Sequence, residues 1–129
     1  MTRPPIELSP AEWEIMHTIW KADKPVTVRD VVDRAYPNDE KAYTTVQTLM
    51  NILVKKGVLS RSKEGRQIVY TSTMARHDAL HSSLQGAARR MFQGSWGTMA
   101  SFLVGRANLS PEEIARLRRI LDEKEEDTS

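Results

Sequence analysis

The chain has 129 residues, of which 40% are apolar and 28% charged, with a net charge of +2 and no cysteine. This composition predicts a small soluble globular protein, or a small domain with an appendage that buries its apolar face against a second copy. The lack of cysteine excludes disulfides, thiolate metal sites and a cysteine nucleophile. No stretch approaches the ~20 apolar residues of a membrane span, and the first ten residues lack a signal-peptide core, so we expect a cytoplasmic protein that does not bind membranes.

Two short helices with clear N-terminal signals are predicted first. Ser9, with Glu12 three residues later, forms a capping box in which each side chain can bond the other's backbone amide. Apolar residues at three- and four-residue spacing follow and predict a core-facing helix. Thr27 and Asp30 repeat the capping box, and Pro37 ends the second helix.

A third helix and a hairpin follow. The helix is predicted over residues 42–56, with Gly57 as a left-handed cap. Strand-forming residues then flank a polar turn at residues 63–65, which predicts a β-hairpin with Arg61 and Arg66 close to its tip. The positions of the third helix expected to face the core are Val46, Leu49, Met50 and Leu53.

Positive charge gathers on this part of the chain. Residues 41–76 hold seven Lys and Arg side chains against one acidic residue, Glu64, a local net charge of +6. A concentration of this kind behind one helix and one hairpin is typical of a surface that contacts phosphates.

The outward side of the third helix has the chemistry to read bases. Gln and Asn amides can pair with adenine through two hydrogen bonds, Thr offers a hydroxyl and a methyl group, and Lys can hold the backbone. A plain solvated helix face would look similar, but the adjacent charge favours nucleic acid. The predicted DNA-binding residues are Tyr43, Thr44, Thr45, Gln47, Thr48, Asn51 and Lys55 on the helix, with Arg61 and Arg66 on the hairpin.

The C-terminal part is predicted to be helical and incomplete on its own. A long helix over residues 75–93 is interrupted by Gly94 and Gly97, a short apolar segment follows, and Ser110 with Glu113 caps a last helix. The acidic tail, residues 122–129, is expected to fray. Helices with an apolar face and no further core in the chain need a partner to pack against, and a second subunit is the simplest partner.

The predicted fold is mainly α with a small β-hairpin wing: an N-terminal winged helix-turn-helix followed by a C-terminal helical dimerisation region. The segments LSPAEWEIMHTIW (8–20), VTVRDVVDRA (26–35), AYTTVQTLMNILVKKGVLSR (42–61), GRQIVY (65–70) and LSPEEIARLRRIL (109–121) resemble the penicillinase-repressor family (BlaI/MecI/CopY) of dimeric winged-helix repressors. The resemblance covers the chain almost end to end.

This resemblance implies a repressor in which residues 1–73 bind one half-site of a double-stranded DNA operator and residues 74–129 hold a homodimer together. Family operators are inverted repeats built on TACA and TGTA. Thr44, Thr45, Gln47 and Thr48 match positions that touch the major groove in family members, and Gln47 replaces an arginine found in some of them. The residues expected in the dimer interface are Leu80, Leu84, Met91, Phe92, Trp96, Phe102, Leu103, Ile114, Leu117, Ile120 and Leu121.

The resemblance also suggests how the repressor is released. Antibiotic-responsive members are cut in the dimerisation region before a phenylalanine, and the matching bond lies between Ser101 and Phe102, so a sensor protease is a possible partner. Copper-responsive members bind metal through a cysteine-rich tail, which this cysteine-free chain cannot do.

One other interpretation of the third helix and hairpin stays open at this point. The third helix and hairpin could bind an acidic protein instead of DNA, as a winged-helix interaction module. His77, Asp78 and His81 spell H-D-x-x-H, but no third ligand or catalytic carboxylate is apparent, so neither a metal nor another cofactor is expected. Ser82 and Ser83 have no plausible base, and we expect no enzymatic activity.

Overall fold

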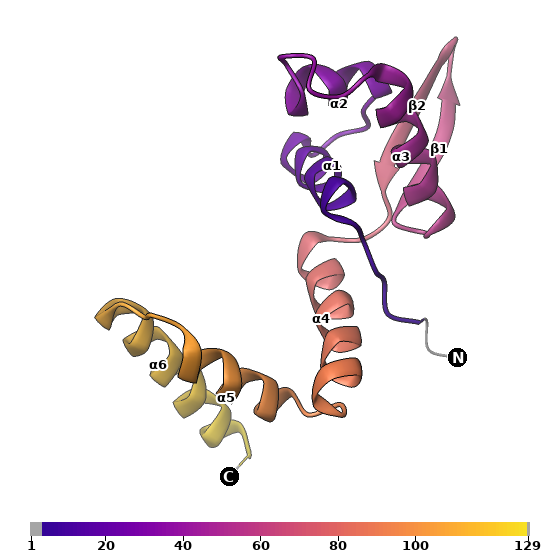
Figure 1. The fold of residues 1–129 in the computed structure, drawn as a ribbon. Coiled ribbons are helices and arrows are strands. Elements are labelled where there is room, and N and C mark those ends of the chain that lie inside the picture. The colour runs from indigo at the N-terminus through magenta and orange to yellow at the C-terminus, as the bar shows by residue number, and fades with distance from the viewer. Residues whose placement is uncertain (1–3, 129) are drawn as a thin grey trace. The chain divides into compact units, whose positions relative to one another are not determined.

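The computed structural model describes residues 4–128 and divides the chain into two compact units, one that reaches Ala87 and one that begins at Ala88 (Figure 1). The helices and strands are α1 (Pro10–Ala22), α2 (Val28–Ala35), α3 (Tyr43–Lys55), β1 (Leu59–Glu64), β2 (Gln67–Ser72), α4 (Arg76–Phe92), α5 (Trp96–Arg106) and α6 (Pro111–Thr128). The predicted order of helices and hairpin is confirmed. α4 passes from the first unit into the second.

The predicted helix starts are present as closed capping boxes. Ser9 N–H donates to Glu12 Oε1 over 2.7 Å, and Glu12 N–H donates to Ser9 Oγ over 3.2 Å. The same reciprocal pair joins Thr27 and Asp30 at α2. These bonds satisfy amides that a helix leaves open at its N-terminus, so local sequence alone fixes where α1 and α2 begin.

The core of the first unit lies among α1, α2, α3 and the base of the hairpin. The apolar periodicity of each helix turns one side inward, as the sequence predicts for α3, where Val46, Met50 and Leu53 are fully buried and Leu49 is partly buried. The buried cluster contains Leu8, Ile15, Met16, Ile19, Val26, Val28, Val31, Val32, Tyr36, Val46, Met50, Leu53, Val58, Leu59 and Tyr70.

The hairpin is anchored to this core at its base and extends away from it. β1 and β2 pair antiparallel from Leu59 opposite Ser72 to Glu64 opposite Gln67. Tyr70 exchanges both backbone hydrogen bonds with Val26, at 2.7 and 3.0 Å. The turn is Gly65 and Arg66 instead of residues 63–65, because the positive φ of 63° falls on the glycine and the two residues before it still pair in β1.

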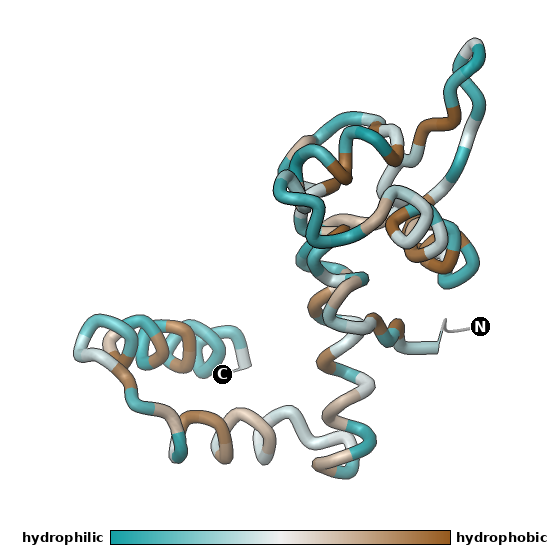
Figure 2. The backbone as a smooth tube through the Cα atoms, turned by 45° about the horizontal axis from the view of Figure 1, so that its top comes forward, coloured by the Kyte–Doolittle hydropathy of each residue, from teal (hydrophilic) through white to brown (hydrophobic). Residues whose placement is uncertain are grey.

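The second unit consists of the end of α4 with α5 and α6. Gly94, with φ of 83°, ends the helix before it as predicted, but Gly97 lies inside α5 and interrupts nothing. The acidic tail was predicted to fray, which is wrong for the described residues, because α6 continues to Thr128. Its start carries the predicted capping box of Ser110 and Glu113. Hydrophobic positions recur along both α5 and α6 (Figure 2).

Candidate nucleic-acid interface

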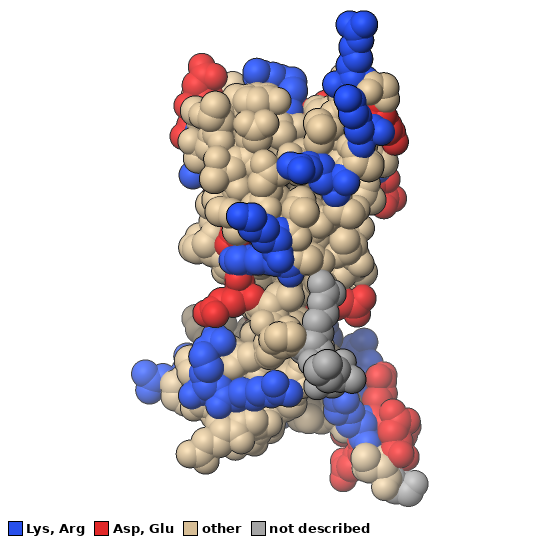
Figure 3. Space-filling model, turned by 90° about the vertical axis from the view of Figure 1, so that its right-hand side faces the viewer, with Lys and Arg blue, Asp and Glu red and all other residues tan. Residues whose placement is uncertain are grey.

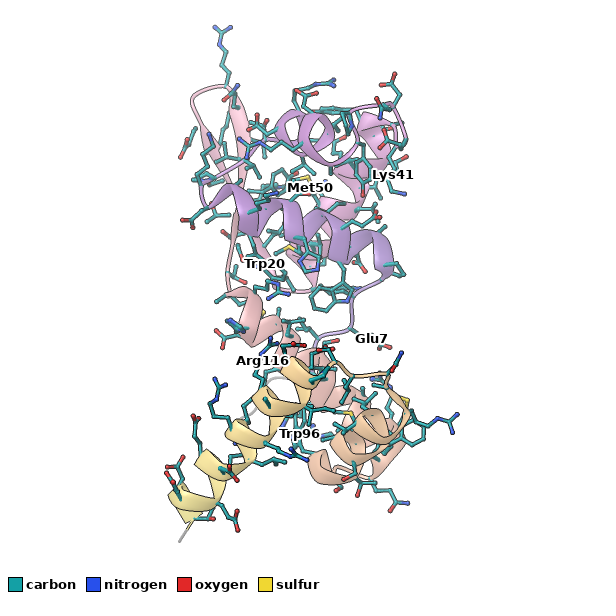
Figure 4. All side chains as sticks on the ribbon, turned by 90° about the vertical axis from the view of Figure 1, so that its left-hand side faces the viewer. Glu7, Trp20, Lys41, Met50, Trp96 and Arg116 are labelled. Carbon is teal, nitrogen blue, oxygen red and sulfur yellow. The ribbon has the colours of Figure 1, made fainter. Side chains whose placement is uncertain are left out.

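The outer side of α3 carries an exposed row of short polar side chains. Met50 points inward among the helices of the first unit (Figure 4), and burial of this side leaves Thr44, Thr45, Gln47 and Thr48 exposed on the other. Thr48 Oγ1 donates to the Thr44 carbonyl over 2.9 Å, so its hydroxyl oxygen remains available as an acceptor. The face therefore offers both donors and acceptors of short reach.

The N-terminus of α3 differs from those of α1 and α2. Its cap residue, Ala42, makes no side-chain capping hydrogen bond, and the first turn contains no acidic residue. In α1 and α2, the carboxylates of Glu12 and Asp30 lie at the positive end of the helix dipole. In α3 no carboxylate offsets this positive end, and its first amides have no side-chain partner at the cap. This end of α3 is suited to lie against an anion.

A groove joins the start of α2, the outer side of α3 and the hairpin. Arg29 stacks over the Tyr43 ring, with its guanidinium carbon 5.0 Å from the ring centroid. The groove thus contains one arginine from α2, Arg29, and two from the hairpin, Arg61 and Arg66, and the two hairpin arginines were predicted from sequence. Its lining residues are Thr27, Val28, Arg29, Tyr43, Gln47, Arg61, Arg66, Gln67, Ile68 and Tyr70.

Arg29 is the charged residue of the groove that was not predicted from sequence. It lies in a part of the chain outside the basic stretch, and nothing in local spacing shows that α2 begins beside the start of α3. The only signal in the sequence was that Arg29 is the second residue of α2, the helix that directly precedes α3.

The far end of the hairpin is basic and exposed. Arg66 occupies the turn, and Arg61 and Lys63 are exposed on β1. Blue Lys and Arg side chains stand out at the projecting end of the first unit in Figure 3. A projecting loop of this composition is suited to contact phosphates.

The cluster of seven basic residues does not act as a single surface. Lys56 Nζ lies 2.8 Å from Glu12 Oε1 and 2.7 Å from the Glu7 carbonyl oxygen, so this charge is used inside the domain. Lys41 lies over the Tyr36 ring, 5.5 Å from its centroid. Lys55 is exposed, and its contact with the DNA backbone stays a prediction.

Asn51 is half-buried, and its amide oxygen already has two partners. Arg61 Nη1 and Tyr70 Oη each donate to Asn51 Oδ1 over 3.0 Å. Among the predicted DNA-binding residues of α3 it is the one whose polar group is tied to the hairpin.

The histidine motif of α4 gains no further ligand in the structure. His77, Asp78 and His81 are exposed, and no group of three potential metal-binding side chains occurs among residues 4–128. His17 lies between two tryptophans of α1, with ring centroids 5.8 Å from Trp13 and 5.6 Å from Trp20, which is a packing role. In the part of the chain that the structure describes, no helix has the length and apolar content that crossing a membrane requires.

The family model of the penicillinase repressor matches residues 8–123, which includes every helix and strand described above except the last residues of α6. The chain belongs to the penicillinase repressor family. The resemblance found in the sequence segments is thereby confirmed.

Two relatives with established names match over most of the chain. The penicillinase repressor of Bacillus licheniformis is 32% identical over 117 residues, 91% of this chain and 91% of the relative. The methicillin resistance regulatory protein MecI of Staphylococcus aureus strain N315 is 28% identical over 118 residues, 92% of this chain and 95% of the relative.

Among solved structures, the Bacillus licheniformis BlaI monomeric form in complex with the blaP half-operator has a TM-score of 0.50 to this chain at 32% identity. The match covers 60% of this chain and 93% of the BlaI chain. The DNA-binding domain of BlaI in a further solution structure matches with the same coverage and TM-score at 35% identity. Together with the two-stranded hairpin, these matches confirm the predicted winged-helix fold.

Proposed function

We propose that this penicillinase repressor family member is a DNA-binding transcriptional repressor that binds its operator as a homodimer. The observation that carries the proposal is the groove in which the exposed polar side of α3 meets arginines from α2 and the hairpin. The BlaI relative is solved in complex with a half-operator, and its 32% identity supports the same use of this surface here.

On this proposal α3 enters the major groove and reads bases through Thr44, Thr45, Gln47 and Thr48. Gln47 is exposed and lines the groove of the protein between α2, α3 and the hairpin. Its amide can form two hydrogen bonds with adenine. Arg29, Arg66 and Lys55 hold phosphates, which fixes the register of the helix without choosing a sequence. Arg29 is an addition to the predicted contacts, since it lies over the Tyr43 ring and lines the same groove as Gln47 and Arg66.

The proposed dimer is formed by the second unit together with the adjoining part of α4. No residue of α6 is buried in the single chain, and Met91 and Leu121 each keep 64% of their surface exposed. A single chain that exposes so many large apolar side chains is expected to cover them with a second copy. We infer that residues 74–129 make this interface and that residues 1–73 of each copy bind one half-site.

A twofold homodimer requires an operator with two matching half-sites. We propose an inverted repeat of TACA and TGTA, as in the family. Because one half-site contact alone binds weakly, dimerisation raises the affinity by making the second contact intramolecular.

We further propose release by cleavage between Ser101 and Phe102, by a protease coupled to a sensor. Both residues are exposed, but the bond lies near the middle of α5. Proteases bind extended chains, so α5 must unwind locally before the bond can be cut. Cleavage would detach α6 and with it much of the proposed dimer surface.

The proposal is tested by fluorescence anisotropy with the full chain and three labelled duplexes: the TACA/TGTA inverted repeat, the same bases scrambled, and one half-site alone. We expect the repeat to bind at least 100-fold more tightly than the scrambled duplex at 150 mM salt. Equal affinity for the repeat and the scrambled duplex would contradict the proposal of a sequence-specific repressor. Absence of any binding at low salt would instead favour a protein-interaction module.

A further inference from the structure

Asn51 connects the third helix to both strands of the hairpin. Arg61 and Tyr70 are direct partners across the β-ladder, so their side chains leave the hairpin on the same side. Both donate to Asn51 Oδ1 over 3.0 Å. Since a guanidinium can only donate hydrogen bonds, the amide atom that faces it has to be the oxygen.

The two partners of Asn51 depend on it to different degrees. Tyr70 is 2% exposed and is fixed by its backbone bonds to Val26, so it keeps its place without the amide. Arg61 is exposed, and Asn51 holds its guanidinium at one Nη1 atom. Arg61 also lines the groove, and its guanidinium has further N–H groups that can donate to a phosphate.

An asparagine that reads adenine needs both ends of its amide, the oxygen to accept from N6 and the nitrogen to donate to N7. The oxygen of Asn51 is already engaged by two donors, and the side chain is half-buried. We propose that Asn51 is a positioning residue that orients Arg61 toward the DNA backbone and sets the angle between hairpin and α3, and that it does not read a base. This inference rests on the proposed DNA-binding function and assigns Asn51 a role within it.

The test is a double-mutant cycle on DNA affinity with Asn51→Ala, Arg61→Ala and the combined variant. We expect Asn51→Ala to weaken binding to the operator and to the scrambled duplex by the same factor, about fivefold. Arg61→Ala should then cost almost nothing more in the Asn51→Ala background, because the arginine has already lost its orientation. Gln47→Ala is the matched control, since loss of a base contact lowers operator affinity alone.

A fall in operator affinity with unchanged affinity for the scrambled duplex would make Asn51 a base reader and overturn the proposal. Additive costs of the two substitutions would overturn it as well. Should Asn51→Ala fail to fold, as judged by urea unfolding, Asn51→Asp keeps an acceptor for both donors. Because the carboxylate still accepts from both donors, that variant should retain the stability of the domain. Its added negative charge repels phosphates whatever the sequence, so affinity for both duplexes should fall alike, and a fall for the operator alone would count against positioning.

A second measurement needs no DNA. NMR relaxation of the Arg61 side-chain Nε–H in the free protein should show an ordered guanidinium, more rigid than that of Arg66 at the turn, and Asn51→Ala should abolish the difference. Equal mobility of the two arginines in the unmodified protein would refute the positioning role even if DNA binding is intact. If the unmodified protein binds no duplex while Arg61 is ordered through Asn51, the proposed function fails and the structural link stands.

Discussion

Lys56 at the end of α3 donates to Glu12 at the start of α1 over 2.8 Å, and so joins the helix that presents the polar face to the helix that opens the domain. The Glu12 side chain is 4% exposed, and its Oε2 atom is buried without a hydrogen-bond partner among the described residues. Ser9 N–H donates to the same oxygen as Lys56. One carboxylate therefore caps α1 and holds the end of α3.

The first prediction concerns the loss of Lys56. Lys56→Met leaves the buried Glu12 charge without its cation, and the unfolding free energy should fall by about 2 kcal/mol, less than for a fully buried pair because the lysine is partly exposed. Combining it with Glu12→Gln should recover part of this loss, since no charge is then left unpaired. Urea unfolding measures both values. Lys55→Met is the control and should change stability by under ~0.5 kcal/mol, and an equal loss in the two lysine variants would contradict the role of the pair.

The second prediction concerns acid stability. Burial disfavours the charged form of Glu12, but hydrogen bonds from Lys56 and Ser9 outweigh this effect and hold its pKa below the ordinary 4.5. A carboxyl group with a lowered folded pKa stabilises the protein above its unfolded pKa, and this contribution is lost as the pH falls through the folded value. The unfolding free energy should therefore begin to fall near pH 4.5 and continue to fall below it. In Glu12→Gln the decline should be shallower over the same interval, and parallel curves for the two proteins would show that another group is responsible.

How much of this fold is readable from sequence depends on the distance along the chain over which each contact acts. The capping boxes at Ser9 and Thr27 and the inward positions of α3 follow from neighbours within four residues, so they were predicted correctly. The turn of the hairpin was misplaced because glycine at position 65 could either end or begin the loop, and the strand pairing that decides this is not visible in composition.

The site was predicted less completely than the fold. The bond between Lys56 and Glu12 joins residues 44 positions apart, and the proximity of Arg29 to Tyr43 depends on how α2 and α3 pack. Charge counting treated Lys56 as available for DNA although it is engaged inside the domain. Periodicity placed Asn51 on the outer face, but it could not show that the hairpin folds back against it.

The third prediction separates base reading from backbone contact. Gln47→Ala should lower affinity for the operator about tenfold and leave the scrambled duplex unaffected, because only a base contact distinguishes sequences. Arg29→Ala should weaken both duplexes alike and reduce the slope of log affinity against log salt by about one, as expected for one lost phosphate contact. Anisotropy titrations between 50 and 300 mM salt measure both effects. If Arg29→Ala leaves the salt slope unchanged, the guanidinium does not contact phosphate.

The fourth prediction addresses the proposed dimer. Leu121→Glu places a charge on a side chain that is 64% exposed in the single chain, so the fold of each copy should be unaffected while the dimer weakens at least 30-fold. Ala115→Glu is the control, because it adds the same charge to another face of α6. Sedimentation equilibrium gives the two dissociation constants. Equal constants would place the interface elsewhere.

The fifth prediction concerns the proposed cleavage between Ser101 and Phe102. Gly97 lies in the first turn of α5 and Gly105 in the last, and in both places a Cβ would meet open space. Replacing both with alanine should stabilise α5 by about 1 kcal/mol in total, since glycine is a poor helix former, and should not disturb its surroundings.

If the bond is cut only from a locally unwound α5, the double alanine variant should be cleaved about fivefold more slowly. The rate is measured by incubation with a protease that cuts before aromatic residues, followed by mass spectrometry of the fragments. Ala100→Gly, at an exposed position beside the bond, should accelerate cleavage by a similar factor. The same rate in all three proteins would mean that unwinding of α5 does not limit access to the bond, and helix stability could then not control the release of the repressor.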